Sequence, residues 1–392
     1  MEKLWKYKKI GEVCIVERGA SPRPIDKYIT DNESGINWIK IGDTSDSIYI
    51  TETAQKIIVE GMKKSRYVKP GDFLLSNSMS FGRPYILKID GCIHDGWLVL
   101  RDENALFDKR FLYYYLSSKT TYKKLKSMAV GGVVNNLNSE MVRNVIVPVP
   151  DKEEQSEIAD LFDKIKKILD DRKQELEQLD TLVKSRFVEM FGDIITGKYN
   201  YKIRKLGDVA FIGSSHRVFT TEFVESGIPF YRGTEIGELA NGIEPSEPYY
   251  ISEEHYNKLT KNNTKPRIGD LLMPSICNKG QIWMVDTDRP FYYKDGRVLC
   301  ISPNRDIFNS KYLEYFMRIK TLVEYPKLGS GSTFAEFKIF LLKDMDVLVP
   351  PRNVQNQFAD FVASVDKSKS KIQKSLEETQ LLFDSLMQKY FG

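Results

Sequence analysis

The second half of this 392-residue chain repeats the first half at a spacing of 200 positions. Phe191-Gly192 recurs as Phe391-Gly392, and no gap is needed anywhere between Val147 and Gly192. Further identities across this spacing lie at positions 147, 149, 150, 155, 159, 160, 167, 176, 177, 182 and 185. A chain with such a repeat presents two copies of one surface, so it must fold into two similar halves.

Residues 151–192 and 351–392 each predict one long helix. Pro148 and Pro150 end the preceding strand, and Asp151 with Glu154 is typical of an N-cap and its N3 partner. Apolar residues then recur at three- and four-residue steps until Gly192. A helix of about 40 residues is roughly 60 Å long and cannot bury its apolar face alone.

We therefore expect the two long helices to pack on each other as an antiparallel coiled coil. The alternative is that each helix belongs to the core of its own domain. The residues expected to pack between the helices or to dock partners are Ile158, Leu161, Ile165, Leu176, Leu179, Phe358, Phe361, Val365, Leu376 and Leu382.

The segments 1–150 and 193–350, the latter beginning with a linker at 193–200, also align with small gaps. Gly71-Asp72 matches Gly269-Asp270, and Asp95-Gly96 matches Asp295-Gly296. Short β-rich runs alternate with turn residues, and one amphipathic helix is expected near 108–126 and another near 308–324. The predicted fold is α+β, with two pseudo-symmetric globular domains separated by the two long antiparallel helices.

Composition is that of an ordinary globular protein, with 41% apolar and 29% charged residues. No apolar run is long enough to cross a membrane, no apolar signal region opens the chain, and the four cysteines form no disulfide pattern. These features favour the cytoplasm. Residues 1–150 hold 23 Lys and Arg against 17 Asp and Glu, a net charge of +6. This charge is too mild for non-specific coating of nucleic acid.

Motifs for catalysis are missing from the sequence. There is no GxGxxG or GxxxxGK[ST] phosphate loop, no Asn/Asp-Pro-Pro-aromatic motif, and no metal-ligand spacing among the histidines. His94-Asp95 could be half of a catalytic pair, but its repeat counterpart is Lys294, so a loop role is favoured. Pro150-Asp151 with Asp171-Arg172-Lys173 fits a nuclease pattern, yet both aspartates fall on one helix roughly 30 Å apart. We expect neither catalytic nor metal-ligating residues.

Polar loops with glycine and long hydrogen-bond donors follow Gly71-Asp72 and Gly269-Asp270. Hydroxyl and amide groups suit contacts to phosphates or base edges, and Arg, Asn and Gln make bidentate base contacts. A plain polar turn is an equally acceptable interpretation for any single residue. The candidate DNA-binding residues are Lys40, Ser76, Asn77, Ser78, Ser80, Arg83, Asn135, Asn136, Arg232, Ser275, Asn278, Lys279, Gln281, Arg297, Ser332 and Thr333.

The chain resembles the specificity subunit of type I restriction-modification systems. The residues that carry the resemblance are Val147-Pro148-Val149-Pro150 with Gln155 and Ala159, their echo from Val349 to Ala359, Gly71 to Ser76, and Lys205 to Val209. The resemblance covers the entire chain. It implies two target-recognition domains that each read one half of a split DNA site, and long helices that dock two methyltransferase subunits.

The resemblance also implies that restriction subunits join through those partners. S-adenosylmethionine, ATP and Mg²⁺ are then expected on the partner subunits, with no cofactor bound by this chain. Because the loops of the two domains differ, the DNA site should be asymmetric, and the helices should set the spacer between its halves. Two other hypotheses remain: a duplicated-domain nuclease or methyltransferase with its own activity, and a protein-binding scaffold.

Overall fold

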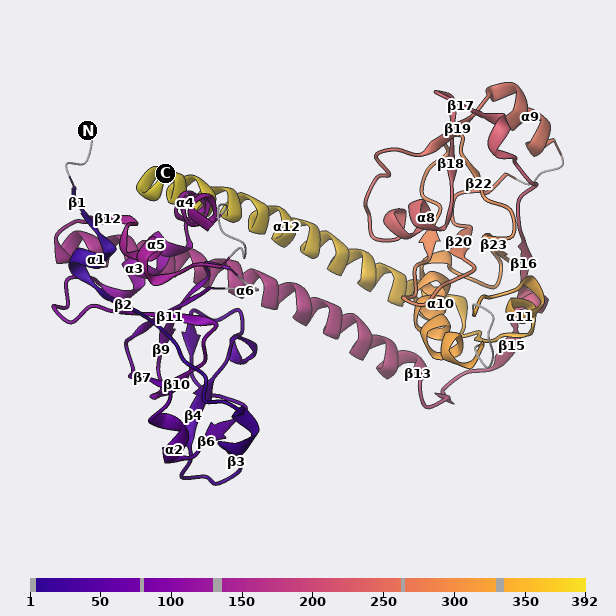
Figure 1. Cartoon of the computed structure of the whole chain (residues 1–392). Coiled ribbons are helices and arrows are strands. Elements are labelled where there is room, and N and C mark those ends of the chain that lie inside the picture. Colours follow the sequence, from indigo (N-terminus) through magenta and orange to yellow (C-terminus); the bar gives the residue numbers. More distant parts are fainter. Residues whose placement is uncertain (1–4, 78–80, 130–135, 262–264, 329–334) are drawn as a thin grey trace. The chain divides into compact units, whose positions relative to one another are not determined.

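The computed structural model describes residues 5–77, 81–129, 136–261, 265–328 and 335–392. The chain divides into two compact units, one of Met1–Gln174 with Gln373–Gly392 and one of Glu175–Ile372 (Figure 1). The divisions fall within two 40-residue helices, α6 (Lys152–Phe191) and α12 (Arg352–Phe391). Each unit therefore combines one globular segment with part of each long helix. The mixed helix-and-sheet architecture expected from the sequence is confirmed.

The described residues of unit 1 form two five-stranded sheets, with orders β2-β11-β8-β9-β5 and β3-β6-β4-β10-β7, and the ribbon β1-β12. Most neighbouring strands are antiparallel, whereas β4–β10 and β5–β9 are parallel. The strands are β1 (Lys6–Lys9), β2 (Ile15–Arg18), β3 (Ile29–Thr30), β4 (Ile36–Ile39), β5 (Tyr49–Ile50), β6 (Lys56–Ile57), β7 (Arg66–Val68), β8 (Phe73–Ser76), β9 (Pro84–Leu87), β10 (Gly91–Ile93), β11 (Trp97–Arg101) and β12 (Ile146–Val149).

Strand β8 shows why unit 1 is layered. Successive side chains of a strand point to opposite faces. Phe73 and Leu75 accordingly join the core that contains helix α3, whereas Leu74 joins the core shared with Ile39 of the second sheet. The first sheet is therefore covered on both faces. The helices of this unit, besides α6 and α12, are α1 (Ile10–Val13), α2 (Val59–Met62), α3 (Lys109–Ser117), α4 (Lys119–Ala129) and α5 (Ser139–Arg143).

Unit 2 repeats this plan in its described residues with four-stranded sheets, ordered β16-β23-β20-β21 and β17-β19-β18-β22. Strands β18 and β22 are parallel. The strands are β13 (Gly192–Asp193), β14 (Lys198–Tyr199), β15 (Ile203–Lys205), β16 (Ala210–Gly213), β17 (Phe223–Val224), β18 (Ile228–Tyr231), β19 (Tyr249–Ile251), β20 (Leu271–Pro274), β21 (Trp283–Met284), β22 (Tyr292–Tyr293), β23 (Val298–Pro303) and β24 (Asp346–Leu348). The shorter helices are α7 (Leu206–Val209), α8 (Gly233–Leu239), α9 (Glu253–Thr260), α10 (Ser310–Glu324) and α11 (Ile339–Asp344).

A buried glutamine ties the start of each long helix to its globular segment. Gln155 accepts a hydrogen bond from the Asp108 amide at 2.8 Å and donates to the carbonyls of Leu106 and Pro150 at 3.1 and 2.9 Å. Gln355 repeats the arrangement with Asn309, Ile307 and Pro350 at 2.9, 2.9 and 2.8 Å. Both glutamines are fully buried. This shared clamp gives a physical reason for the glutamine in both repeats.

Within each unit the two long helices pack through aromatic side chains. In unit 1, Phe162 near the start of α6 contacts Phe383 and Phe391 near the end of α12. In unit 2, Phe187 and Phe191 at the end of α6 contact Phe358 near the start of α12. The paired segments therefore run in opposite directions in each unit.

The predicted packing residues differ in burial. Ile158, Ile165, Phe358 and Val365 are buried, and the half-buried members are Leu161, Leu176, Leu179, Phe361 and Leu376. Leu382 is 53% exposed, so of its two expected roles the exposure favours partner docking over packing between the helices. The apolar residues near the end of α12 lie at positions 381, 382, 383, 386 and 387 and form a stripe that is wider than the helix face covered by the core of unit 1. Phe383 is the residue of the 381–383 run that packs against that core.

The helix expected near 108–126 is two helices, because Ser118 adopts an extended conformation between α3 and α4. The Ser118 hydroxyl accepts a hydrogen bond from the Thr121 amide at 3.1 Å and so begins the second helix. Its counterpart near 308–324 is one helix, α10, begun by Asn309.

Candidate nucleic-acid interface

Three of the predicted DNA-binding side chains are buried at the exits of strands β8 and β20. Ser76, Asn77 and Ser275 are each at most 1% exposed. The Ser76 hydroxyl accepts from the Arg83 amide at 3.0 Å, and the Asn77 amide group donates to the Asp95 carbonyl at 2.8 Å. Because these side chains are enclosed by the domain, the expectation that they contact DNA is wrong; they fix the surrounding loops.

The main chain at two of these positions is hydrogen-bonded as well. The carbonyl of Asn77 accepts from the Leu137 amide at 3.1 Å, and that of Ser275 accepts from the Phe337 amide at 2.7 Å. In both units, the residue after a central strand (β8 or β20) is thus hydrogen-bonded to the segment that precedes the last short helix (α5 or α11).

Other predicted side chains do reach solvent. Arg83 is half-exposed, lies over the Tyr85 ring at 5.4 Å and faces Asp46 at 3.6 Å. Arg297 is exposed and donates to Glu336 at 3.0 Å. Asn278 and Lys279 are exposed, whereas Gln281 and Asn136 are half-buried. The predicted residues Ser78, Ser80, Asn135, Ser332 and Thr333 lie outside the described residues.

In both units, two nitrogen-bearing side chains directly follow a pair of parallel strands. In unit 1, Lys40 follows β4 and His94 follows β10. In unit 2, Arg232 follows β18 and Lys294 follows β22. Of these four residues, Lys40 and Arg232 are among the predicted DNA-binding residues, whereas His94 and Lys294 are not. The signal was present, because both missed residues precede the repeated Asp-Gly dipeptide.

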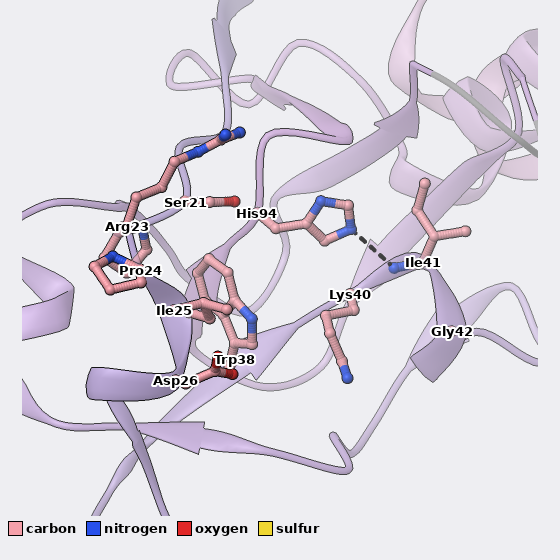
Figure 2. Close-up of a pocket in the computed structure, with 11 residues that line it drawn as sticks. Ser21, Arg23, Pro24, Ile25, Asp26, Trp38, Lys40, Ile41, Gly42 and His94 are labelled. Carbon is pink, nitrogen blue, oxygen red and sulfur yellow. Dashed lines mark hydrogen bonds between the residues drawn. The ribbon is translucent and has the colours of Figure 1, made fainter.

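A pocket of about 880 Å³ opens beside Lys40 and His94 (Figure 2). Asp95 holds one wall, since its carboxylate accepts from the Ser21 hydroxyl at 2.9 Å and from the Arg23 guanidinium at 3.1 Å. Burial raises the pKa of Asp95, but these hydrogen bonds outweigh burial and bring the pKa below its ordinary value. The lining comprises Ser21, Pro22, Arg23, Pro24, Ile25, Asp26, Trp38, Lys40, Ile41, Gly42 and His94.

His94 positions the opposite wall of this pocket. Its Nε2 faces the Ile41 amide at 3.1 Å (Figure 2). Its Nδ1 faces the Gly96 amide at 2.7 Å. Burial lowers the pKa of His94, and the carboxylate of Asp95 offsets only part of that effect. An imidazolium accepts no hydrogen bond, whereas the neutral ring accepts one. The geometry and the direction of the pKa shift therefore agree on a neutral ring at pH 7.

Arg232 is held firmly in unit 2. Its Nη2 lies 2.6 Å from the buried Glu235 carboxylate, and its guanidinium lies over the Tyr249 ring at 4.6 Å. Burial raises the pKa of Glu235, but the hydrogen bond from Arg232 leads the contacts that bring it below its ordinary value. The side chain of Arg232 is still 43% exposed. A charged, oriented fork of donors therefore remains open to solvent.

No cluster of three or more His, Cys, Asp or Glu side chains suited to a metal ion occurs in the part of the chain that the structure describes. Among the same residues, no helix is long and apolar enough to span a membrane.

Comparison with known proteins shows which proteins the chain resembles. Residues 2–179 match the type I restriction modification DNA specificity domain. The MjaIX specificity subunit of a type I restriction enzyme from Methanocaldococcus jannaschii is 23% identical over 411 aligned positions, covering 99% of this chain and 92% of that protein. The MjaVIII specificity subunit of the same organism is 22% identical, covering 95% of this chain and 90% of that protein.

Solved structures share the fold. A chain from a structure of a type I restriction-modification system matches with a TM-score of 0.64 at 18% identity, covering 99% of this chain and 97% of that one. The type I restriction-modification S subunit from M. genitalium matches with a TM-score of 0.55 at 15% identity, covering 100% and 97%. Over almost its whole length, the chain is therefore similar to type I restriction-modification specificity subunits.

Proposed function

We propose that the chain reads an asymmetric, bipartite DNA site, with residues 1–150 reading one half and residues 193–350 the other. The observation that carries this proposal is that both units have the same pair of parallel strands but different side chains at the matching positions after them. Lys40 and His94 occupy the strand ends where unit 2 has Arg232 and Lys294. Because different donors select different base edges, two such domains select two unlike half-sites.

The long helices supply the docking surface for two methyltransferase subunits. In unit 2, Leu182 is 48% exposed and lines a pocket of about 560 Å³ with Phe361 and Arg186. The repeat places Leu382 and Leu161 at the matching positions of unit 1, where Leu382 is 53% exposed. Exposed apolar side chains on a helix favour a partner helix. Two matching patches suit two copies of one partner.

The opposed helix segments in each unit support an antiparallel coiled coil between α6 and α12. The ion pair between Lys369 and Asp180 adds a polar link between the two helices within unit 2. In this proposal the coiled coil sets the non-specific spacer between the half-sites, and restriction subunits join through the methyltransferase. The chain acts in the prokaryotic cytoplasm and supplies recognition alone. S-adenosylmethionine, ATP and Mg²⁺ bind to the partner subunits.

A competition assay tests the proposal. The chain is reconstituted with its methyltransferase, and binding to a duplex that carries the methylated sequence is competed with scrambled duplexes at physiological salt. We expect the specific duplex to bind at least roughly a thousandfold more tightly. Equal competition by scrambled duplexes, or methylation without sequence preference, contradicts the proposal. Methylation by the isolated chain contradicts the assignment of catalysis to the partner.

A further inference from the structure

We propose that each domain reads bases at the carboxyl ends of its parallel strand pair. In domain 1 the reading position is the pocket beside Lys40 and Arg23, and in domain 2 it is the surface that carries Arg232 and Lys294. The ligand in both cases is the edge of base pairs in duplex DNA. This inference rests on the proposed function and assigns it to particular residues.

Strand direction brings these side chains together. Two parallel strands end at the same edge of a sheet, so the residues that follow them lie side by side. Trp38 of β4 pairs with Cys92 of β10, and Phe230 of β18 pairs with Tyr292 of β22. The residue two positions after each of these is basic or imidazole-bearing. The frame thus presents two nitrogen-bearing side chains at one point in each domain.

The pocket of domain 1 combines cations at its rim with apolar walls. Arg23 is largely exposed, and Lys40 reaches solvent while its Nζ donates to Gln55 at 2.8 Å. Ile25, Ile41 and the prolines form apolar walls (Figure 2). Cations suit phosphates or acceptors on base edges, and apolar walls suit the methyl group of thymine. The net charge of +6 over residues 1–150 favours DNA over a neutral ligand.

Domain 2 offers a different donor at the matching position. The Arg232 Nε and Nη2 atoms both lie within hydrogen-bonding distance of Glu235. None of these bonds to Glu235 uses Nη1. The guanidinium can therefore present Nη1 and the second Nη2 hydrogen as a fixed pair of donors, which matches guanine O6 and N7. We expect the half-site of domain 2 to contain a guanine that Arg232 reads.

The test uses the complex reconstituted with its methyltransferase. Lys40→Gln should weaken binding by roughly tenfold or more and relax only the half-site of domain 1. Arg232→Lys should relax only the half-site of domain 2, because a lysine keeps the charge beside Glu235 but lacks the fork. Lys8→Gln is the matched control, since it removes one exposed charge from β1, at the far end of unit 1 from β4 (Figure 1).

Binding is measured at several salt concentrations, the methylated sequence is determined for each variant, and thermal melting confirms folding. Changes confined to the expected half-sites support the inference. Lys40→Gln and Arg232→Lys complexes that melt normally and match Lys8→Gln in affinity and methylated sequence overturn it. A wild-type complex without sequence preference instead contradicts the proposed function, so the two failures are distinguishable.

Discussion

Replacing the buried clamp residue Gln355 with methionine should destabilise unit 2. Methionine has a similar length but neither donates nor accepts the three hydrogen bonds to Asn309, Ile307 and Pro350. Each buried backbone group left unpaired costs about 1–3 kcal/mol. The apolar methionine side chain returns about 1–2 kcal/mol relative to the buried amide. The expected net loss in the free energy of unfolding is about 3 kcal/mol.

This loss is measurable by calorimetry or chemical denaturation. For a unit of roughly 200 residues, a loss of about 3 kcal/mol lowers Tm by ~6–12 °C. Gln357→Met is the matched control, because Gln357 is exposed two residues further along the same helix. Gln155→Met should have the same effect on unit 1. If Gln355→Met and Gln357→Met have the same stability to within about 0.5 kcal/mol, the clamp is not a stabilising contact and the reasoning is refuted.

Three further predictions concern the helices and the pocket. Inserting four residues, about one helical turn, at matching positions of α6 and α12 should lengthen the spacer in the methylated sequence, whereas an unchanged spacer would exclude the helices as its ruler. Leu182→Ser and Leu382→Ser should together weaken methyltransferase binding by roughly tenfold without lowering Tm, since both side chains are exposed. Val188→Ser is the control, because Val188 is exposed on another face of α6. If Val188→Ser weakens methyltransferase binding as much as the double variant does, the proposed docking surface is contradicted. Burial holds the pKa of His94 below its ordinary 6.5, so as the pH falls the imidazole is protonated in the unfolded chain before it is protonated in the folded chain. The free energy of unfolding should therefore fall as the pH drops below about 6.5. If a His94→Gln variant loses stability just as steeply between about pH 7.5 and 5.5, His94 is not the cause.

Long-range repetition made the long helices predictable. Asp151 does cap α6 by accepting from the Glu154 amide at 2.8 Å, as its position before an apolar stripe indicated. Helix α10 also appears where periodicity placed it. Helix caps and amphipathic helices depend on residues a few positions apart, and a sequence pattern shows such spacings directly.

The candidate site was less predictable, because burial depends on contacts between distant segments. Asn77 and Ser275 look like polar loop residues, yet the Asp95 and Phe337 segments cover them. Lys294 appeared to argue against a role for His94, because a lysine cannot repeat histidine catalysis. The parallel strand pairs reveal that the two residues share a position instead. Strand direction, which no local pattern encodes, supplies that information.

Methylome sequencing of cells that carry the methyltransferase, with and without this chain, tests the central claim most directly. The account predicts one methylated motif that appears only when the chain is present and has two unlike halves separated by a non-specific spacer. A methylation pattern that is unchanged when the chain is removed, or that shows no sequence preference in its presence, would contradict the account.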